Sequence, residues 1–176
     1  MDILSQIHPE LWRGHQLGRL PQRAVPTGWA SLDGQLPGGG WPRQALTELL
    51  LKHPGVGEMR LLASALSAIA RGEHGTARAV MLFDPPATPC AWAMEQLGLP
   101  AQTLIVVHGR EGLRGAALRH LLTATDVLWA LEQALRSGHA GAILAWLPDR
   151  LRADSLRRLQ LAAQAHDGPV FLLRGI

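Results

Sequence analysis

A glycine-rich turn at residues 52–57 lies between an apolar run and a long apolar segment, where a phosphate-binding loop would stand. In such a loop, backbone N–H groups and a helix N-terminus bind phosphate, a lysine neutralises it and a serine or threonine holds magnesium. Gly55 and Gly57 are present, but Glu58 occupies the lysine position and Met59 the hydroxyl position. A carboxylate repels phosphate by roughly 4 kcal/mol per charge pair at about 4 Å and an effective dielectric of about 20. The loop is therefore predicted to bind no nucleotide, with phosphate binding by the backbone alone as the alternative.

Apolar runs alternate with amphipathic segments along the rest of the chain. Runs that are apolar on both faces and separated by helices predict a mostly parallel α/β sheet with helices on both faces. The predicted strands are residues 45–51, 79–83, 103–107, 141–146 and 170–173. The predicted helices are residues 59–71, 88–97, 126–137 and 154–166.

The first 26 residues differ in composition from the remainder, being polar and interrupted by proline and glycine. We interpret residues 1–26 as an N-terminal arm and residues 27–176 as one core domain. Leu11 and Trp12 lie on the apolar side of a short helix predicted in the arm, so they are candidate contacts for a partner protein.

Composition excludes several classes of protein. A net charge of +3, with Lys52 as the one lysine, permits association with nucleic acid without requiring it; a GC-rich genome is an equal explanation. The eight histidines have no metal-binding spacing, and Cys90 is the single cysteine, so neither metal nor cofactor is expected. Without a long apolar run or a signal peptide, the chain is expected in the cytoplasm and not in a membrane.

Residues 27–33 and 36–42 resemble the beginning of a RecA-type core, and later strands and helices resemble those that follow in RecA. The chain is identified as a member of the ImuA family, RecA-like accessory proteins of bacterial mutagenic translesion DNA synthesis. The motifs that carry this resemblance are Trp12-Arg13-Gly14, Pro26-Thr27-Gly28, Leu36-Pro37-Gly38-Gly39-Gly40-Trp41-Pro42, Leu46-Thr47-Glu48-Leu49-Leu50 and Leu128-Trp129-Ala130-Leu131-Glu132-Gln133-Ala134-Leu135. Residues 83–174 also resemble the cell-division inhibitor SulA, which does not share the glycine-rich segment before residue 43.

The resemblance implies a RecA-like core whose phosphate-binding loop is degenerate. Pro86 stands where RecA-like ATPases place a catalytic glutamate, and Trp146 stands where the magnesium-associated aspartate is expected. Proline can neither accept a proton nor orient water. Together with the losses at Glu58 and Met59, these positions predict that the protein is not an enzyme. Because RecA-like cores continue beyond the fifth strand, the sequence is expected to be a short or truncated member.

The resemblance also implies partners. ImuA proteins act with ImuB, an inactive Y-family polymerase homologue, and through it with an error-prone DnaE-type polymerase and the sliding clamp. RecA, DNA and a second copy of the chain are further expected partners. The alternative function is a SulA-like inhibitor of cell division that binds FtsZ.

Two groups of residues have both a functional and a purely structural interpretation. Trp41 either contacts a partner or packs inside the domain. A basic cluster around the last predicted helix either contacts DNA or forms a solvated helix face, and no aromatic residues are interleaved with it for base stacking. Its members are Arg150, Arg152, Arg157 and Arg158.

Overall fold

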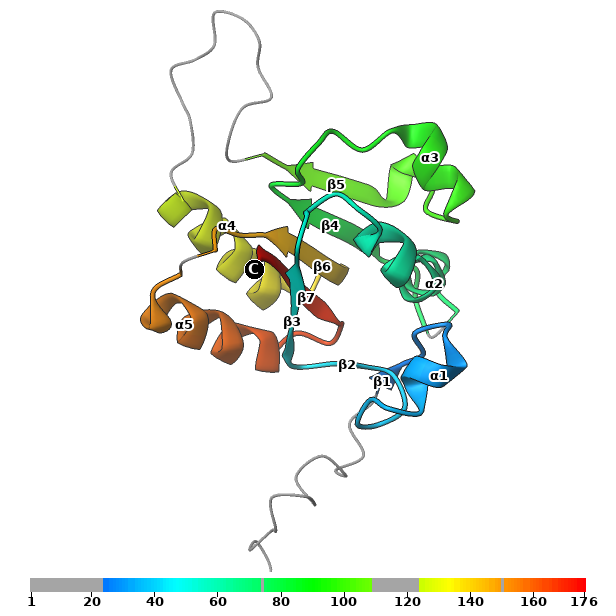
Figure 1. Cartoon of the computed structure of the whole chain (residues 1–176), viewed down its shortest axis with the longest axis horizontal. Coiled ribbons are helices and arrows are strands. Elements are labelled where there is room, and N and C mark those ends of the chain that lie inside the picture. Colours follow the sequence, from blue (N-terminus) through cyan, green and yellow to red (C-terminus); the bar gives the residue numbers. More distant parts are fainter. Residues whose placement is uncertain (1–23, 74, 109–123, 150) are drawn as a thin grey trace, which may run out of the picture.

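The computed structural model describes residues 24–73, 75–108, 124–149 and 151–176 (Figure 1). The predicted N-terminal arm therefore lies outside the described residues, apart from residues 24–26. Residues 109–123, which follow the third predicted strand, also lie outside the described residues. The same is true of Arg150, one of the four arginines of the basic cluster.

A five-stranded sheet forms the centre of the domain, and every pair of neighbouring strands in it is parallel. Its order is β3 (Leu46–Leu51), β7 (Val170–Gly175), β6 (Ala140–Trp146), β4 (Ala79–Phe83) and β5 (Leu104–Val107). All five correspond to predicted strands, so the parallel α/β sheet is confirmed.

Helices cover both faces of this sheet, as predicted (Figure 1). On one face, α2 (Glu58–Arg71) and α3 (Ala91–Gln96) pack on side chains of β4 and β6. On the other face, α4 (Ala124–Ser137) and α5 (Ala153–Gln164) pack on each other and on the sheet. The two resulting cores are separate, because successive side chains of a strand point to opposite faces.

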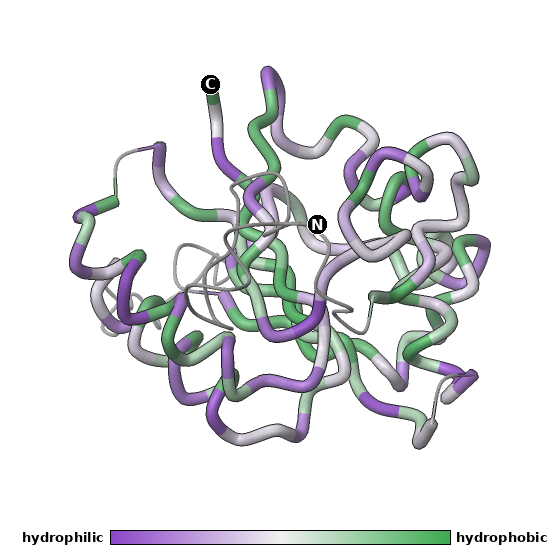
Figure 2. The backbone as a smooth tube through the Cα atoms, turned by 90° about the horizontal axis from the view of Figure 1, so that it is seen from below, coloured by the Kyte–Doolittle hydropathy of each residue, from purple (hydrophilic) through white to green (hydrophobic). Residues whose placement is uncertain are grey.

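Strand β6 shows this alternation best, because all seven of its residues are buried. Ala142, Leu144 and Trp146 belong to the core beneath α2, whereas Ile143 and Ala145 belong to the core beneath α4 and α5. In Figure 2 the hydrophobic colour is concentrated along the central strands, and hydrophilic residues lie toward the outside. The direction of Trp146, toward α2, is what allows it to reach the β3–α2 loop.

Strand β3 departs from the sequence analysis in its burial. The run was predicted to be buried, but β3 is an edge strand that pairs only with β7, and Leu50 is 57% exposed. A continuous apolar run is typical of a central parallel strand, yet the pattern alone does not reveal how many neighbours the strand has. At the other edge, β5 follows a short 3-10 helix, Ala101–Thr103.

The glycine-rich segment forms a small structure of its own before the sheet. Strands β1 (Ala24–Val25) and β2 (Trp41–Pro42) pair antiparallel, and α1 (Ala30–Asp33) lies between them. The backbone N–H of Thr27, a fully buried residue, donates a 2.9 Å hydrogen bond to the Asp33 carboxylate. This bond joins the turn before α1 to the last residue of that helix.

Two helix starts differ from the predicted ones. Helix α3 begins at Ala91 with Cys90 as its N-cap, not at Thr88, and α5 has Arg152 as its N-cap instead of Asp154. Asp154 lies in the first turn of α5, where a carboxylate is also favourable. Because these residue types suit both the cap and the first turn, sequence places such boundaries only to within one or two residues. Gly98 ends the α3 region in a left-handed conformation, as predicted.

Candidate functional site

The candidate site lies at the carboxyl ends of β3, β4 and β6, where the β3–α2 loop (residues 52–57) leads into α2. The loop makes its turn with two glycines in the left-handed region, Gly55 at φ 91° and Gly57 at φ 99°. Gly57 is the N-cap of α2, and it provides no side chain to bind the first N–H groups of the helix. A strand, a glycine turn and a helix N-terminus are therefore arranged as in a phosphate-binding loop.

The Glu58 side chain is folded back into this loop, although every residue from 52 to 57 is exposed. Only 3% of Glu58 is exposed. Its Oε1 accepts a 2.5 Å hydrogen bond from the backbone N–H of Gly55 and a 3.0 Å hydrogen bond from Nε1 of Trp146. Oε2 is buried and has no hydrogen-bond partner. The carboxylate is thus held between the β3–α2 loop and the end of β6.

Two cavities lie near the loop; Trp146 borders both, and Glu58 lines the smaller one. The smaller, about 170 Å³, is lined mostly by apolar groups that include Met59, Pro86 and Trp146. The larger, about 450 Å³, extends toward His108 and Pro148. Both lie at the carboxyl ends of parallel strands, the usual position of ligand sites in open α/β sheets.

Pro86 and Asp84 stand beside the loop, at the end of β4. Asp84 adopts φ 52°, a left-handed conformation that aspartate tolerates better than most residues, and its N–H bonds to Val107 O at 2.8 Å. Pro86 lies next to Gly55, since a Cβ added to Gly55 would be 3.4 Å from Pro86 Cγ. The structure thus brings Gly55, Glu58 and Trp146 together, with Pro86 alongside.

Trp41 lies in the core. It is 3% exposed, and its ring packs edge-on against Phe171 with the ring centroids 5.2 Å apart. Of the two interpretations of Trp41, the structural one therefore holds, and its indole offers no surface to a partner. Leu11 and Trp12, the other candidate partner contacts, lie outside the described residues.

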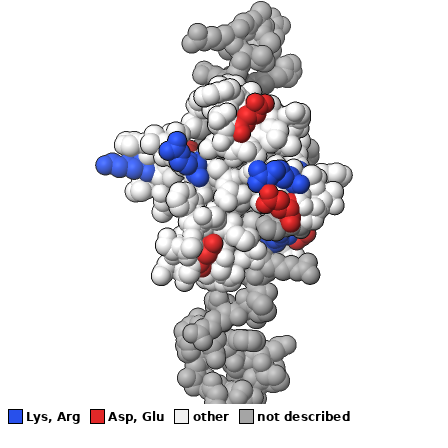
Figure 3. Space-filling model, turned by 90° about the vertical axis from the view of Figure 1, so that its right-hand side faces the viewer, with Lys and Arg blue, Asp and Glu red and all other residues white. Residues whose placement is uncertain are grey.

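The described arginines of the basic cluster differ in their contacts. Arg158 forms an ion pair with Glu132, a buried carboxylate that also binds Arg136 at 2.6 Å. Arg152 and Arg157 are exposed at the start of α5, and Arg150 lies outside the described residues. Figure 3 shows the opposite side, that of α1, α2 and α3, where the blue and red groups are few and one blue group touches a red one. Among the described residues drawn there, the basic groups do not form a continuous stripe of the kind that follows a nucleic-acid backbone.

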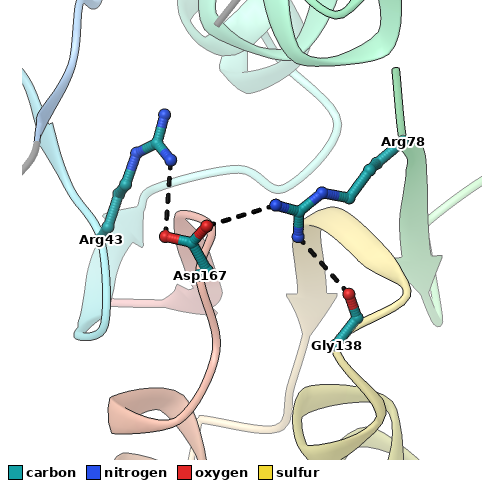
Figure 4. Close-up of polar contacts among 4 residues, drawn as sticks. All are labelled: Arg43, Arg78, Gly138 and Asp167. Carbon is teal, nitrogen blue, oxygen red and sulfur yellow. Dashed lines mark hydrogen bonds and ion pairs between the residues drawn. The ribbon is translucent and has the colours of Figure 1, made fainter. Parts of the chain in front are cut away.

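A second polar cluster lies at the amino ends of the strands, opposite the loop (Figure 4). Asp167 binds Arg43 at 3.5 Å and Arg78 at 3.2 Å, and Arg78 also donates to the carbonyl of Gly138. These contacts join the segments before β3, β4, β6 and β7. The cluster therefore holds the four strand starts together, and sequence spacing gave no sign of it.

His166 is fully buried beside this cluster. Burial and the Arg78 guanidinium lower the pKa of His166 below its ordinary value of 6.5, while the Leu135 backbone and Asp167 oppose that shift. The backbone of Leu135 lies near the His166 ring, but neither ring nitrogen of His166 has a partner in hydrogen-bond geometry. The imidazole is accordingly held in its neutral form.

Three tryptophans are exposed on helical segments: Trp29 by 48%, Trp92 by 70% and Trp129 by 60%. Trp29 is anchored, because its Nε1 donates to Leu61 O at 3.3 Å. Trp92 on α3 lies in the segment that leads to the edge strand β5, whose Ile105 is also 45% exposed. The sequence analysis did not select Trp92 or Trp129, since each fits an amphipathic helix pattern and only the packing reveals its exposure.

Among the described residues, no group of three or more histidine, cysteine, aspartate or glutamate side chains is arranged to hold a metal ion. In the same part of the chain, every helix is too short or too polar to cross a bilayer.

No protein-family model matches the chain, and no curated protein sequence matches it. Among solved structures, the chain is similar to the crystal structure of SulA from Pseudomonas aeruginosa. That likeness has a TM-score of 0.54 and 22% sequence identity, and it covers 74% of this chain and 98% of the SulA chain. The chain therefore has a SulA-like α/β fold.

Proposed function

We propose that this chain is a non-catalytic, RecA-like adaptor of the ImuA type, which acts by binding proteins in SOS-induced mutagenic translesion synthesis and DNA repair. One observation supports the non-catalytic part: the Glu58 carboxylate is folded into the β3–α2 loop, where Gly55 N–H and Trp146 Nε1 donate to it. A nucleotide would have to displace a buried carboxylate and would then meet neither a lysine nor a magnesium ligand.

The glycine-rich segment supports the ImuA assignment over other RecA-like proteins. It is built into the domain: Val25 and Trp41 belong to the core beneath α2, and Gly28 approaches Ser64 of α2 closely. A domain that keeps this segment without binding nucleotide would retain the protein-binding surfaces of a RecA-like core. Its partner in this proposal is an ImuB-type inactive polymerase, with an error-prone DnaE-type polymerase recruited through it.

RecA and DNA are secondary partners in this proposal. DNA contact would rest on Arg152 and Arg157, because Arg158 is already engaged by Glu132. Two exposed arginines supply a weak, salt-dependent contact, so DNA would add to protein binding and not replace it.

The second candidate is a SulA-like inhibitor that binds FtsZ and blocks its polymerisation. What favours it is the fold, which matches the solved SulA chain over 98% of that chain. The glycine-rich segment at residues 27–42 favours ImuA instead, since the sequence resemblance to SulA begins only near Phe83.

A single binding experiment separates the two. The full chain is immobilised and presented with purified ImuB, RecA and FtsZ in turn, and dissociation constants are measured by interferometry. Binding to ImuB with no binding to FtsZ supports the adaptor, and the reverse supports the inhibitor. Calorimetry with Mg-ATP tests the non-catalytic part separately: no heat of binding is expected, and micromolar affinity would refute it.

A further inference from the structure

The position of Glu58 is unusual for a residue that opens a helix directly after an exposed loop. A glutamate in that place normally extends into water, because burying a charge is costly unless it is paired. Here the residues before it are exposed, yet only 3% of Glu58 is exposed. A buried carboxylate at this place needs donors directed at it.

Two N–H groups donate to Oε1 of Glu58. Gly55 contributes a backbone N–H at 2.5 Å, in a turn that its positive φ makes possible, as backbone N–H groups do in a phosphate-binding loop. The 14-residue α2 begins at Glu58, and the positive end of its dipole favours a negative charge there. Trp146 contributes an indole N–H at 3.0 Å from across the sheet. Oε2 is buried without a partner, so the site has not been adapted to satisfy both oxygens of a carboxylate.

We propose that the β3–α2 loop is an intact anion-binding site whose bound anion is the chain's own Glu58 carboxylate, and that removing this carboxylate opens the site to inorganic phosphate. A tethered group acts at an effective concentration of roughly millimolar or more, so it excludes weakly bound free anions. The adjoining cavity of about 170 Å³ gives an incoming phosphate space once the side chain is shortened.

Beyond the adaptor function, an internal anion would hold the loop in one conformation whether or not a ligand is present. In nucleotide-gated domains, bound phosphate orders the switch segments, and its loss releases them. In this chain, Glu58 and Trp146 connect the loop to the end of β6, and the Glu58 carboxylate takes the place of a bound phosphate. The loop therefore keeps one shape with no ligand present, and surfaces formed around it are always available to partners.

The first test compares Glu58→Ala with the wild-type chain by thermal unfolding. Sodium phosphate is titrated against sodium chloride of equal ionic strength, and Glu95→Ala, which removes an exposed glutamate from α3, is the matched control. In Glu58→Ala, phosphate at ten times its dissociation constant should raise the melting temperature by about 3–6 °C. The wild type and Glu95→Ala should show no rise beyond that in chloride.

The second test does not depend on the stability of the alanine variant. Glu58→Gln keeps an oxygen for both donors but makes it neutral, so the two hydrogen bonds weaken. The amide proton of Gly55 and the indole proton of Trp146 should both move upfield in the NMR spectrum of Glu58→Gln, and neither should move in Glu95→Ala.

Each outcome decides the inference. Unmoved Gly55 and Trp146 signals would show that the carboxylate is not their acceptor and would overturn it. So would a folded Glu58→Ala that responds to phosphate no more than the wild type does. If Glu58→Ala does not fold, the NMR shifts decide alone. The adaptor function fails on different evidence, namely Mg-ATP binding by the wild type or the absence of any binding to ImuB.

Discussion

The indole nitrogen of Trp146 lies 3.0 Å from Oε1 of Glu58, and this bond joins the end of β6 to the start of α2 across 88 residues of sequence. In the proposed RecA-like adaptor, these are the positions where an ATPase would hold its nucleotide and metal. Under that proposal the two residues compensate for each other: the glutamate supplies an anion, and the tryptophan supplies a donor for it.

Replacing Trp146 with phenylalanine removes that donor while keeping an aromatic ring in the core. A hydrogen bond to a charged group contributes about 1.5–3 kcal/mol to stability, and the carboxylate left behind stays buried. We expect Trp146→Phe to lower the free energy of unfolding by an amount in that range, measured by urea denaturation.

The control for this variant is Trp129→Phe, which makes the same chemical change at a tryptophan that is 60% exposed. Exposed substitutions usually change stability by less than about 0.5 kcal/mol. Equal denaturation midpoints for the two variants would show that the bond between Trp146 and Glu58 contributes nothing measurable.

The glycine-rich segment should be sensitive at Gly28 in particular. Gly28 and Gly39 both have positive φ, at 84° and 76°, so alanine is strained at either position. A Cβ on Gly28 would also lie 2.4 Å from Cβ of Ser64, whereas a Cβ on Gly39 meets nothing within 4 Å. Gly28→Ala should therefore lose about 1–3 kcal/mol more stability than Gly39→Ala in parallel urea titrations. If the two lose the same amount, the segment does not pack closely on α2.

The buried His166 predicts a dependence of stability on pH. Because burial and Arg78 lower its pKa in the folded state, the unfolded chain binds a proton there at a pH at which the folded chain does not. The stability is complete above pH 6.5, the ordinary value, and declines as the pH falls from there toward the folded-state pKa. One proton accounts for at most about 1.4 kcal/mol per pH unit.

Substitution of His166 by glutamine should remove this decline, whereas His139→Gln, at an exposed histidine, should leave it in place. The measurement is the urea midpoint of each variant between neutral and mildly acidic pH. A decline that is equally steep in His166→Gln would assign the acid sensitivity to other groups.

The regular elements of this fold could be predicted because they depend on local pattern. Strand β6 is apolar along its length and lies between two amphipathic helices, and such a pattern fixes element type and parallel pairing. The exposure of Leu50 could not be predicted, because it depends on β3 being the sheet edge. The burial of Trp41 likewise depends on Phe171, which is 130 positions later in the chain.

The sequence predicted the candidate site only as a loop that lacks the side chains needed to bind a nucleotide. Spacing predicted that Glu58 and Met59 stand at the lysine and hydroxyl positions of a phosphate-binding loop. Spacing did not predict that the Glu58 side chain is buried, because its burial depends on the hydrogen bond from the indole N–H of Trp146 at the end of β6. A contact between two distant segments leaves no periodic signal in either one.

Two parts of the chain are candidates for the surface that binds the partner: the N-terminal arm and α3. The sequence predicts that Leu11 and Trp12 lie on one side of a short helix in the arm, and burying such side chains contributes roughly 1.5–3 kcal/mol each. Trp92 on α3 is 70% exposed and precedes the exposed edge strand β5. Tryptophan is among the residues that most often dominate binding energy at protein interfaces.

We expect the arm to be the principal contact, so the double variant Leu11→Ala, Trp12→Ala should weaken binding to ImuB and self-association by at least about tenfold, equivalent to about 1.4 kcal/mol. Its thermal unfolding should match the wild type, because the two hydrophobic cores are built from described residues that do not include Leu11 or Trp12. Trp92→Ala, which removes an exposed indole from the core domain, is the comparison. Interferometry with ImuB and sedimentation of the chain alone give the two readouts. A double variant that binds and self-associates like the wild type, beside a weakened Trp92→Ala, would move the partner surface from the arm to α3.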